Sequence, residues 1–194
     1  AYRRQRQMCI RDSLRAETRD WHDRMETLMQ RADVFASRLN YGRFTTAQYL
    51  FQQDVEAFFD DPRLQQAVPD LQVRGRLEAA RQDLLDLEQP IPPQLPQTRH
   101  VTMPSALGWL YVSEGSTLGA AFLFNEAKEK LGLSADFGAR NLAAYPEGRA
   151  RVWRRFIASL DEQPAGDHGS IVQGARSAYA RFEALLLAST SQPT

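Results

Sequence analysis

Apolar residues recur every three or four positions along most of the chain, the spacing of one face of an α-helix. A first helix is predicted from Leu14 onwards. A second helix, capped by Thr45 or Thr46 after a turn at 40–42, is expected to end before Pro62. The inward face of the first helix is formed by Leu14, Thr18, Trp21, Met25 and Leu28.

A third, charged helix is predicted to open at Asp70 and to run over 71–87. Five prolines then interrupt the helical spacing within 89–104, so this segment is expected to cross the surface as a strap. The longest helix is predicted over 105–131 and stops at Gly132. Its length of roughly 40 Å suits the central helix of a small bundle.

Two more amphipathic helices, over 148–160 and 171–187, complete the pattern. The chain is therefore predicted to be all-α, a single-domain bundle of about six to eight helices. Its 47 Ala and Leu residues against 12 Val and Ile favour helix over strand. Residues 1–12 show no apolar periodicity and are expected to be an N-terminal extension, which leaves 13–190 as the helical domain.

Charge and cysteine content narrow the classes of function. The 24 basic and 24 acidic residues balance, which argues against the strongly basic arm of a nucleic-acid binder. A single cysteine, Cys9, excludes an internal disulfide framework and a cysteine-rich metal site. No apolar run approaches the roughly 20 residues that span a bilayer. A cytoplasmic protein is therefore expected.

His22 is predicted to lie inside a strong helix, whereas His100 falls in the proline-rich strap and His168 in a glycine-flanked turn. Glu26, one turn further along, can accept a hydrogen bond from one imidazole nitrogen and leave the other for a metal. Arg15, two turns earlier and roughly 10 Å away on that face, can meet a ligand carboxylate. A hydrogen-bonded structural histidine and a solvated arginine explain the same spacing.

Gly115 and Gly119 fall one turn apart in the middle of the helix predicted over 105–131. Each glycine there costs about 1 kcal/mol relative to alanine, so a closely approaching partner must offset both. That partner is either another helix or a flat ligand, and the spacing favours neither. The segment has neither the spacing of a phosphate loop nor that of a nucleophile elbow. Because the helix contains no His or Arg, only Ser116, Thr117 and backbone groups are expected to hold water.

Two segments of the sequence resemble the heme oxygenases of the soluble bacterial type: LRAETRDWHDRME at 14–26 and ALGWLYVSEGSTLGAAFLF at 106–124. Weaker similarity extends through FASRLNYGRFTTAQYLFQQDVEAFF, FGARNLA and GARSAYARFEALL, and so covers nearly everything after residue 13. The order and separation of the histidine and glycine-rich segments make the resemblance specific. It implies an all-α fold with heme between a proximal helix and a Gly-kinked distal helix.

The resemblance also implies roles for single residues. His22 matches the proximal iron ligand and Glu26 its hydrogen-bond partner. Gly115 and Gly119 match the distal glycines that let heme lie against the backbone. Ser116 stands where relatives place a polar residue of the distal water network, and where the animal enzymes have Asp.

Further positions match with less detail. Gln52 corresponds to a second position of the water network. Arg15 and Tyr111 match contacts to the heme propionates, and Arg154 matches a basic position facing the same edge. Some bacterial relatives carry basic residues after FLF, whereas this chain has Asn125–Glu126, so the anchoring of the propionates and the rotation of heme in the pocket stay open.

The resemblance implies an enzyme for which heme is substrate and cofactor at once. With O₂ and electrons from a donor such as a ferredoxin or a flavin reductase, it would give biliverdin, CO and ferrous iron. One alternative is a heme carrier or sensor on the same scaffold, which binds heme without turnover. Another is a helical interaction domain with a core histidine, which predicts no Soret band with hemin. The meso carbon attacked, the donor, the oligomeric state and the biological purpose are not fixed by the sequence.

Overall fold

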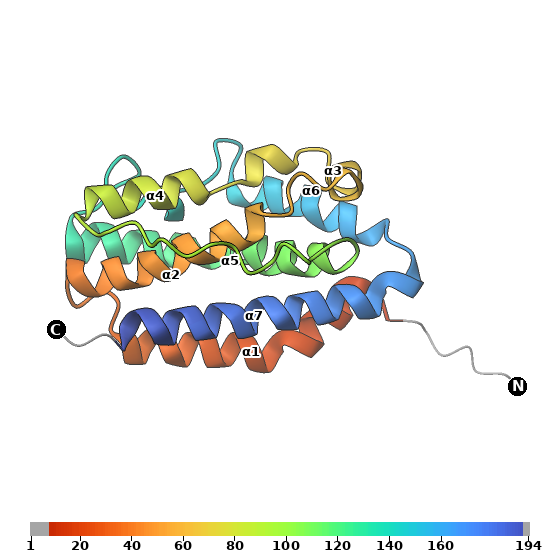
Figure 1. The fold of residues 1–194 in the computed structure, drawn as a ribbon, viewed down its shortest axis with the longest axis horizontal. Helices are drawn as coiled ribbons and strands as arrows, with labels where there is room; N and C mark the ends of the chain where they lie inside the picture. The colour runs from red at the N-terminus through yellow and green to blue at the C-terminus, as the bar shows by residue number, and fades with distance from the viewer. Residues whose placement is uncertain (1–7, 192–194) are drawn as a thin grey trace, which may run out of the picture.

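The computed structural model describes residues 8–191, which form a layered bundle of helices (Figure 1). The elements are α1 (Ile10–Ala32), α2 (Arg38–Glu56), α3 (Pro62–Ala67), η1 (Leu71–Arg74), α4 (Leu77–Asp86), α5 (Ser105–Leu131), η2 (Arg140–Leu142), α6 (Arg149–Asp161), η3 (Ala165–Asp167) and α7 (His168–Thr190). No strand occurs within 8–191, where Ser134 forms only isolated bridges. The prediction of an all-α bundle is confirmed.

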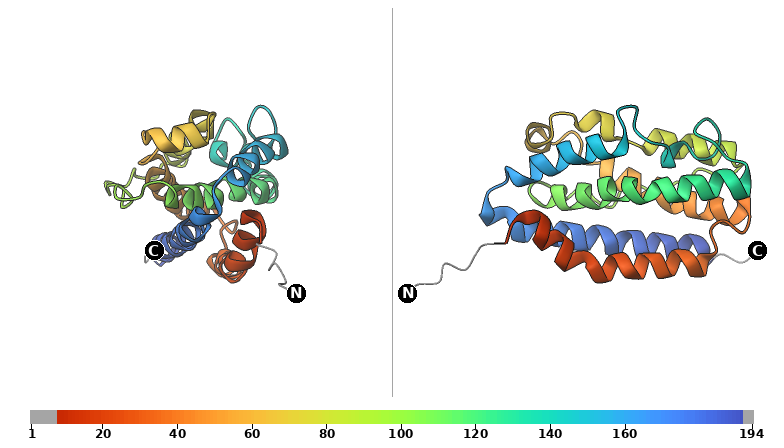
Figure 2. Two further views of the ribbon diagram at one scale, coloured as in Figure 1. Left: turned by 90° about the vertical axis from the view of Figure 1, so that its right-hand side faces the viewer. Right: turned by 180° about the vertical axis from the view of Figure 1, so that it is seen from behind.

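Helices α1 and α7 run side by side along one edge of the bundle, with α2 and α5 in the middle and α3, α4 and α6 at the other edge (Figures 1 and 2). Helix α7 lies against α1, α2 and α5. Its approach to α5 is very close, because a Cβ added at Gly108 would lie 1.9 Å from the carbonyl oxygen of Ile171. A Cβ at Gly174 would lie 2.1 Å from the carbonyl oxygen of Ser105. Glycine is therefore required at this crossing.

Helix α2 begins eight residues earlier than the Thr45 cap predicts. Its N-cap is Ser37, whose hydroxyl accepts a hydrogen bond from the amide of Asn40 at 3.0 Å. The predicted turn at 40–42 is wrong, since these residues are helical. Gly42 serves packing instead, because a Cβ there would lie 2.9 Å from Cγ of Gln89 in the strap.

The single helix predicted over 71–87 is also wrong, because the segment divides at Gly75 into η1 and α4. Glu56, at the end of α2, accepts hydrogen bonds from the amides of Arg76 and Leu77 at 3.0 and 2.6 Å. A carboxylate from another helix therefore satisfies the first amides of α4. Burial raises the pKa of Glu56, and these two amides oppose the increase.

The proline-rich segment crosses the surface as predicted and is bound to the bundle by Asp54. The buried Asp54 carboxylate accepts hydrogen bonds from the amide of Gln97 at 2.8 Å and from Nε of Arg181 at 2.7 Å. The hydroxyl of Thr98 donates to the Asp54 carbonyl oxygen. One α2 carboxylate thus joins the strap to α7.

The predicted boundaries of the last helices agree well with the structure, and α5 spans Ser105–Leu131 as expected. The start of the fold differs. Helix α1 begins at Ile10, whose side chain is buried, so the last part of the predicted extension 1–12 belongs to the bundle. Residues 1–7 lie outside the described part of the chain. Within 8–191, no helix combines the length and apolarity needed to cross a membrane.

Candidate functional site

Helix α1 presents His22 on its exposed face. Thr18 and Met25 lie one turn before and after His22 on nearly the same side of the helix and are buried against the bundle, so His22 and Glu26 stand at the exposed edge of the buried side. A ring nitrogen of His22 and a carboxylate oxygen of Glu26 lie within 4.8 Å of each other, together with a carboxylate oxygen of Asp23. His22 and Glu26 are therefore close to each other, but among the described residues no hydrogen bond joins them.

The two central glycines of α5 face almost no protein. Among residues 8–191, a Cβ added at Gly115 would meet only the Trp153 ring, at 3.6 Å, and a Cβ at Gly119 would meet nothing within 4 Å. Gly108 of the same helix, by contrast, is needed for the crossing with α7. At both positions the described residues therefore bring no helix backbone into close approach, and the Trp153 ring of α6 makes only a van der Waals contact at Gly115. Of the two partners that spacing alone leaves open, this favours a ligand.

The surface around Gly119 is apolar and uncovered. Leu118 and Phe122 lie on the same side of α5, one turn apart, and are 41% and 67% exposed. Large apolar side chains left open beside two uncovered glycines mark a binding surface more often than a solvated face. A flat apolar ligand would cover both.

The far end of this surface is formed by Tyr111. Burial raises the pKa of Tyr111, while the positive charge of Arg15 and a hydrogen bond with Thr18 oppose the increase. Arg15 and Thr18 of α1 thus lie near Tyr111 of α5. The contact of Arg15 and Tyr111 with the heme propionates stays a prediction. The Tyr111 ring also lies 5.7 Å from the ring of Trp153 on α6.

Arg154 follows Trp153 on α6 and is exposed. Among the described residues no hydrogen bond or ion pair joins Arg154 to Arg15, Tyr111 or another residue named above. The structure therefore brings Arg15 and Tyr111 together and leaves Arg154 at the periphery.

Beneath Ser116 lies a polar cluster centred on Ser113. The side-chain amide of Gln52 donates to Oγ of Ser113 at 3.1 Å. Nη2 of Arg76 donates to the Ser113 carbonyl oxygen at 2.8 Å, to its Oγ at 3.1 Å and to Oγ of Ser116 at 3.3 Å. Ser116 donates in turn to the Ser113 carbonyl oxygen at 2.6 Å. The predicted Gln52 and Ser116 are thus joined through residues that the sequence did not single out.

Arg76 joins this cluster without any signal in the sequence. The residue types in α5 predict that only Ser116, Thr117 and backbone groups hold water, whereas a buried guanidinium reaches Ser116 from the start of α4. Nothing in the charged pattern over 71–87 distinguishes Arg76 from the more exposed Arg81, since its burial depends on the break at Gly75.

Two buried atoms of this cluster, Oε1 of Gln52 and Nε of Arg76, have no hydrogen-bond partner in the part of the chain that the structure describes. Each buried polar atom without a partner lowers the free energy of unfolding by about 1 to 3 kcal/mol unless ordered water forms the hydrogen bond. One acceptor and one donor around Ser113 therefore fit a distal water network.

A second buried cluster fixes the position of the glycine-rich segment. Glu114, directly before Gly115, accepts from Nη1 of Arg74 at 2.7 Å and from the hydroxyl of Tyr145 at 2.8 Å. Arg74 and Glu114 are both almost completely buried. Arg149 adds a hydrogen bond of 2.8 Å to the carbonyl oxygen of Thr117. The backbone around Gly115 and Ser116 is thus held from behind.

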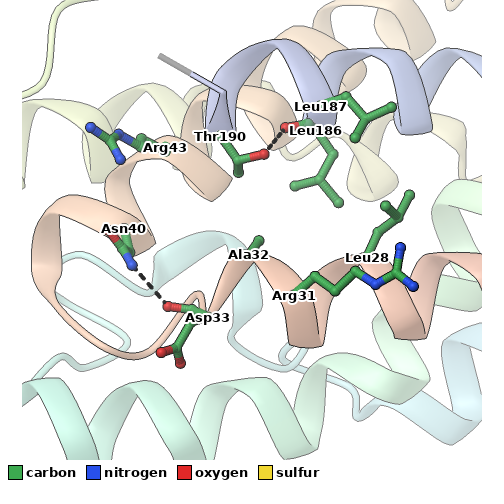
Figure 3. A pocket seen from close by; sticks show the side chains of 9 residues that line it. All are labelled: Leu28, Arg31, Ala32, Asp33, Asn40, Arg43, Leu186, Leu187 and Thr190. Carbon is green, nitrogen blue, oxygen red and sulfur yellow. Dashed lines mark hydrogen bonds between the residues drawn. The ribbon is translucent and has the colours of Figure 1, made fainter. Parts of the chain in front are cut away.

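A cavity of about 480 Å³ lies elsewhere, where α1, the start of α2 and the end of α7 meet (Figure 3). Leu28, Ala32 and Leu186 form its apolar part, and Arg31 and Asn40 lie at its margin. It contains none of the predicted site residues. We therefore locate the site from its chemistry, at the uncovered face of α5.

Comparison with known proteins agrees with this geometry. The family model described as heme oxygenase matches residues 9–188. The chain belongs to the heme oxygenase family. It is 44% identical over 173 residues to the heme oxygenase PigA of Pseudomonas aeruginosa, covering 87% of each chain. A heme oxygenase of Xanthomonas campestris pv. campestris is 33% identical over 121 residues, which are 60% of this chain and 70% of that protein.

The fold of this heme oxygenase is similar to a solved structure of the same family. The NO- and CO-bound heme oxygenase of Neisseria meningitidis superposes with a TM-score of 0.87 at 34% identity, covering 96% of this chain and 94% of that one. The prediction of a heme oxygenase-type helical fold is therefore confirmed. The uncovered Gly115–Gly119 face, with an exposed histidine on the neighbouring helix, fits heme as the ligand.

Proposed function

We propose that this chain cleaves heme with O₂ and electrons to biliverdin, CO and ferrous iron, with heme lying between α1 and α5. The observation that carries the proposal is the contrast among the glycines of α5. Gly108 is required by the crossing with α7, whereas Gly115 and Gly119 face no protein backbone. Their cost to the helix is offset if heme lies against them.

In this proposal His22 would hold the heme iron through one imidazole nitrogen, and Glu26 would orient the imidazole. A neutral imidazole ligand tunes the iron without the strong electron donation of a thiolate. The bound heme supplies the iron that activates O₂ and is itself the molecule oxidised. Arg15 and Tyr111 contact the propionates, and Arg154 adds positive charge at the same edge.

On the other face of the heme, α5 offers no histidine or arginine side chain. Gly115 and Gly119 let the backbone approach, and Ser116, Gln52 and Arg76 hold water near the iron. We propose that the Arg76 guanidinium orients this water through its hydrogen-bond donors. The electron donor is proposed to be a ferredoxin or a flavin reductase.

An absorbance time course of the hemin complex after addition of ascorbate or a reductase system tests the function. Loss of the Soret band with growth of a biliverdin band is expected. A complex that is reduced and never converted would instead indicate a heme carrier or sensor.

The His22→Ala variant tests the ligand. It should lose turnover and the spectrum of a histidine-ligated heme, while keeping part of its affinity for hemin through the α5 surface. His100→Ala, which removes an exposed histidine of the strap, is the matched control and should behave as the wild type. Undiminished biliverdin formation by His22→Ala would overturn the assignment.

A further inference from the structure

Three potential metal ligands lie together on the exposed face of α1. His22, Asp23 and Glu26 each offer one ligand atom, and the three atoms lie within 4.8 Å of one another. Positions i, i+1 and i+4 bring these side chains to neighbouring parts of the helix surface. All three are exposed, so small rotations of their side chains can close the set around one ion. Asp23 has no part in heme binding as proposed above.

We infer that His22, Asp23 and Glu26 form a divalent-cation site that receives the ferrous ion released from heme. This inference rests on the proposed role of His22. Imidazole and carboxylate together suit Fe²⁺, as in the histidine and carboxylate ligand sets of non-heme iron proteins. Water fills the remaining coordination positions.

The transfer is an exchange of ligands without oxidation or reduction. The ferrous ion keeps its bond to His22 while the carboxylates of Asp23 and Glu26 and water oxygens replace the pyrrole nitrogens. Those nitrogens take protons from solvent. The product ion, left without its macrocycle, thus gains two negative charges next to the ligand that already holds it.

The same chemistry makes the site exclusive. A neutral imidazole has one lone pair, because its other nitrogen carries a proton. His22 can therefore bind heme iron or a free cation, but not both at once. Saturation with hemin is expected to abolish cation binding at this site.

Calorimetric titration of the hemin-free protein with Co²⁺ tests the site. Co²⁺ stands next to Fe²⁺ in the Irving–Williams order of affinities and, unlike Fe²⁺, is not readily oxidised by air. One cation per chain is expected. Asp23→Asn should weaken the affinity for Co²⁺ about tenfold, and saturation with hemin should abolish Co²⁺ binding. Asp20→Asn removes an equal charge from the same helix outside the set, and is expected to stay within about twofold of the wild type.

Equal Co²⁺ affinities for Asp23→Asn and Asp20→Asn, or a stoichiometry unchanged by hemin, would overturn the inference. A melting temperature of Asp23→Asn close to that of the wild type shows that the comparison concerns the site and not the fold. Failure of the proposed heme ligation looks different, because His22→Ala would then keep the wild-type Soret spectrum.

A single-turnover experiment tests the link to the product. With a limiting amount of a colorimetric ferrous chelator, Fe²⁺ should become available to the chelator after biliverdin appears. Asp23→Asn should shorten this delay about threefold or more, and Asp20→Asn should not. The same delay in all three proteins would show that the released ion does not pause at this site.

Discussion

Nη2 of Arg76 lies 3.3 Å from Oγ of Ser116, so a buried side chain from the start of α4 reaches Ser116 from behind the uncovered face of α5. The guanidinium is buried, and its second contact, 2.8 Å to the carbonyl oxygen of Ser113, fixes it against the same helix. A permanent positive charge therefore stands directly behind the position proposed for distal water. This relationship makes Arg76 the residue whose replacement tells most about the distal side.

Replacing Arg76 by Gln should lower turnover about 10- to 100-fold, because the donor that orders water near Ser116 is lost. Hemin should still bind with one heme per chain, since Arg76 lies behind the helix and not on its open face. Single-turnover biliverdin formation and a Soret titration measure the two effects. Arg81→Gln is the control, because Arg81 lies in α4 and, among the described residues, has Glu78 as its one ion-pair partner, at 3.4 Å. Equal turnover in both variants would contradict a role for Arg76.

The glycines of α5 should separate into two classes. Gly115→Ala and Gly119→Ala meet no close protein atom, so the hemin-free variants should be as stable as the wild type or up to about 1 kcal/mol more stable. Their affinity for hemin should fall about tenfold, because the new methyl group occupies the space of the heme.

Gly108→Ala should do the opposite. Its Cβ would lie 1.9 Å from the Ile171 carbonyl oxygen, so the bundle should lose about 3 kcal/mol or more, or fail to fold. Thermal unfolding without hemin and Soret titration compare the three variants. Wild-type hemin affinity in both Gly115→Ala and Gly119→Ala would contradict the placement of heme against them.

The sequence predicts a helix boundary correctly where the residues that determine it lie in the same segment, and it fails where a residue from another helix determines it. Helix α5 was predicted with its observed ends, because Pro104 and the left-handed Gly132 mark them within the segment itself. The division at Gly75 was not, because the carboxylate that satisfies the start of α4 comes from Glu56 on another helix. The sequence predicts a turn at Gly42 because nothing near it shows why a helix needs glycine there. The residue that explains it, Gln89, packs against it from the strap.

The candidate site follows the same division. His22, Gly115 and Gly119 stand out by type and spacing within single helices. Arg76 and Ser113 become part of the site only through contacts across helices, and neither carries a pattern of its own. For Gly115 and Gly119, spacing alone does not distinguish a neighbouring helix from a flat ligand. The atoms around each added Cβ, which only the structure shows, favour the ligand.

The buried Arg74–Glu114 pair should behave as a unit. Arg74→Met leaves the Glu114 carboxylate buried with only Tyr145 as a partner, which should cost about 3 to 5 kcal/mol of unfolding free energy. Replacing both residues, Arg74→Met with Glu114→Leu, should recover part of this loss, since no unpaired charge remains. Urea unfolding of the hemin-free single and double variants measures the coupling. Additive losses would show that the two charges do not depend on each other.

Asp83 should make stability fall as pH rises through the weakly acidic range. Its carboxylate is buried between α4 and η2 and accepts hydrogen bonds from the amides of Arg140 and Asn141, each at 2.9 Å. Burial raises the pKa of Asp83 from 3.8 to about 6, and the two amides oppose the increase. Between these values the unfolded chain has lost its proton while the native protein still holds it.

Folding therefore takes up a proton in this range, and the contribution of Asp83 to the unfolding free energy should fall by roughly 2 kcal/mol between pH 4 and pH 6 and become constant above about pH 7. Asp83→Asn removes the titration, so the difference between wild type and variant isolates it from other carboxyl groups. Urea unfolding of both hemin-free proteins at pH 4, 5, 6 and 7 gives that difference. An advantage of the wild type that grows with pH would show instead that the two amides favour the ionised carboxylate over the effect of burial.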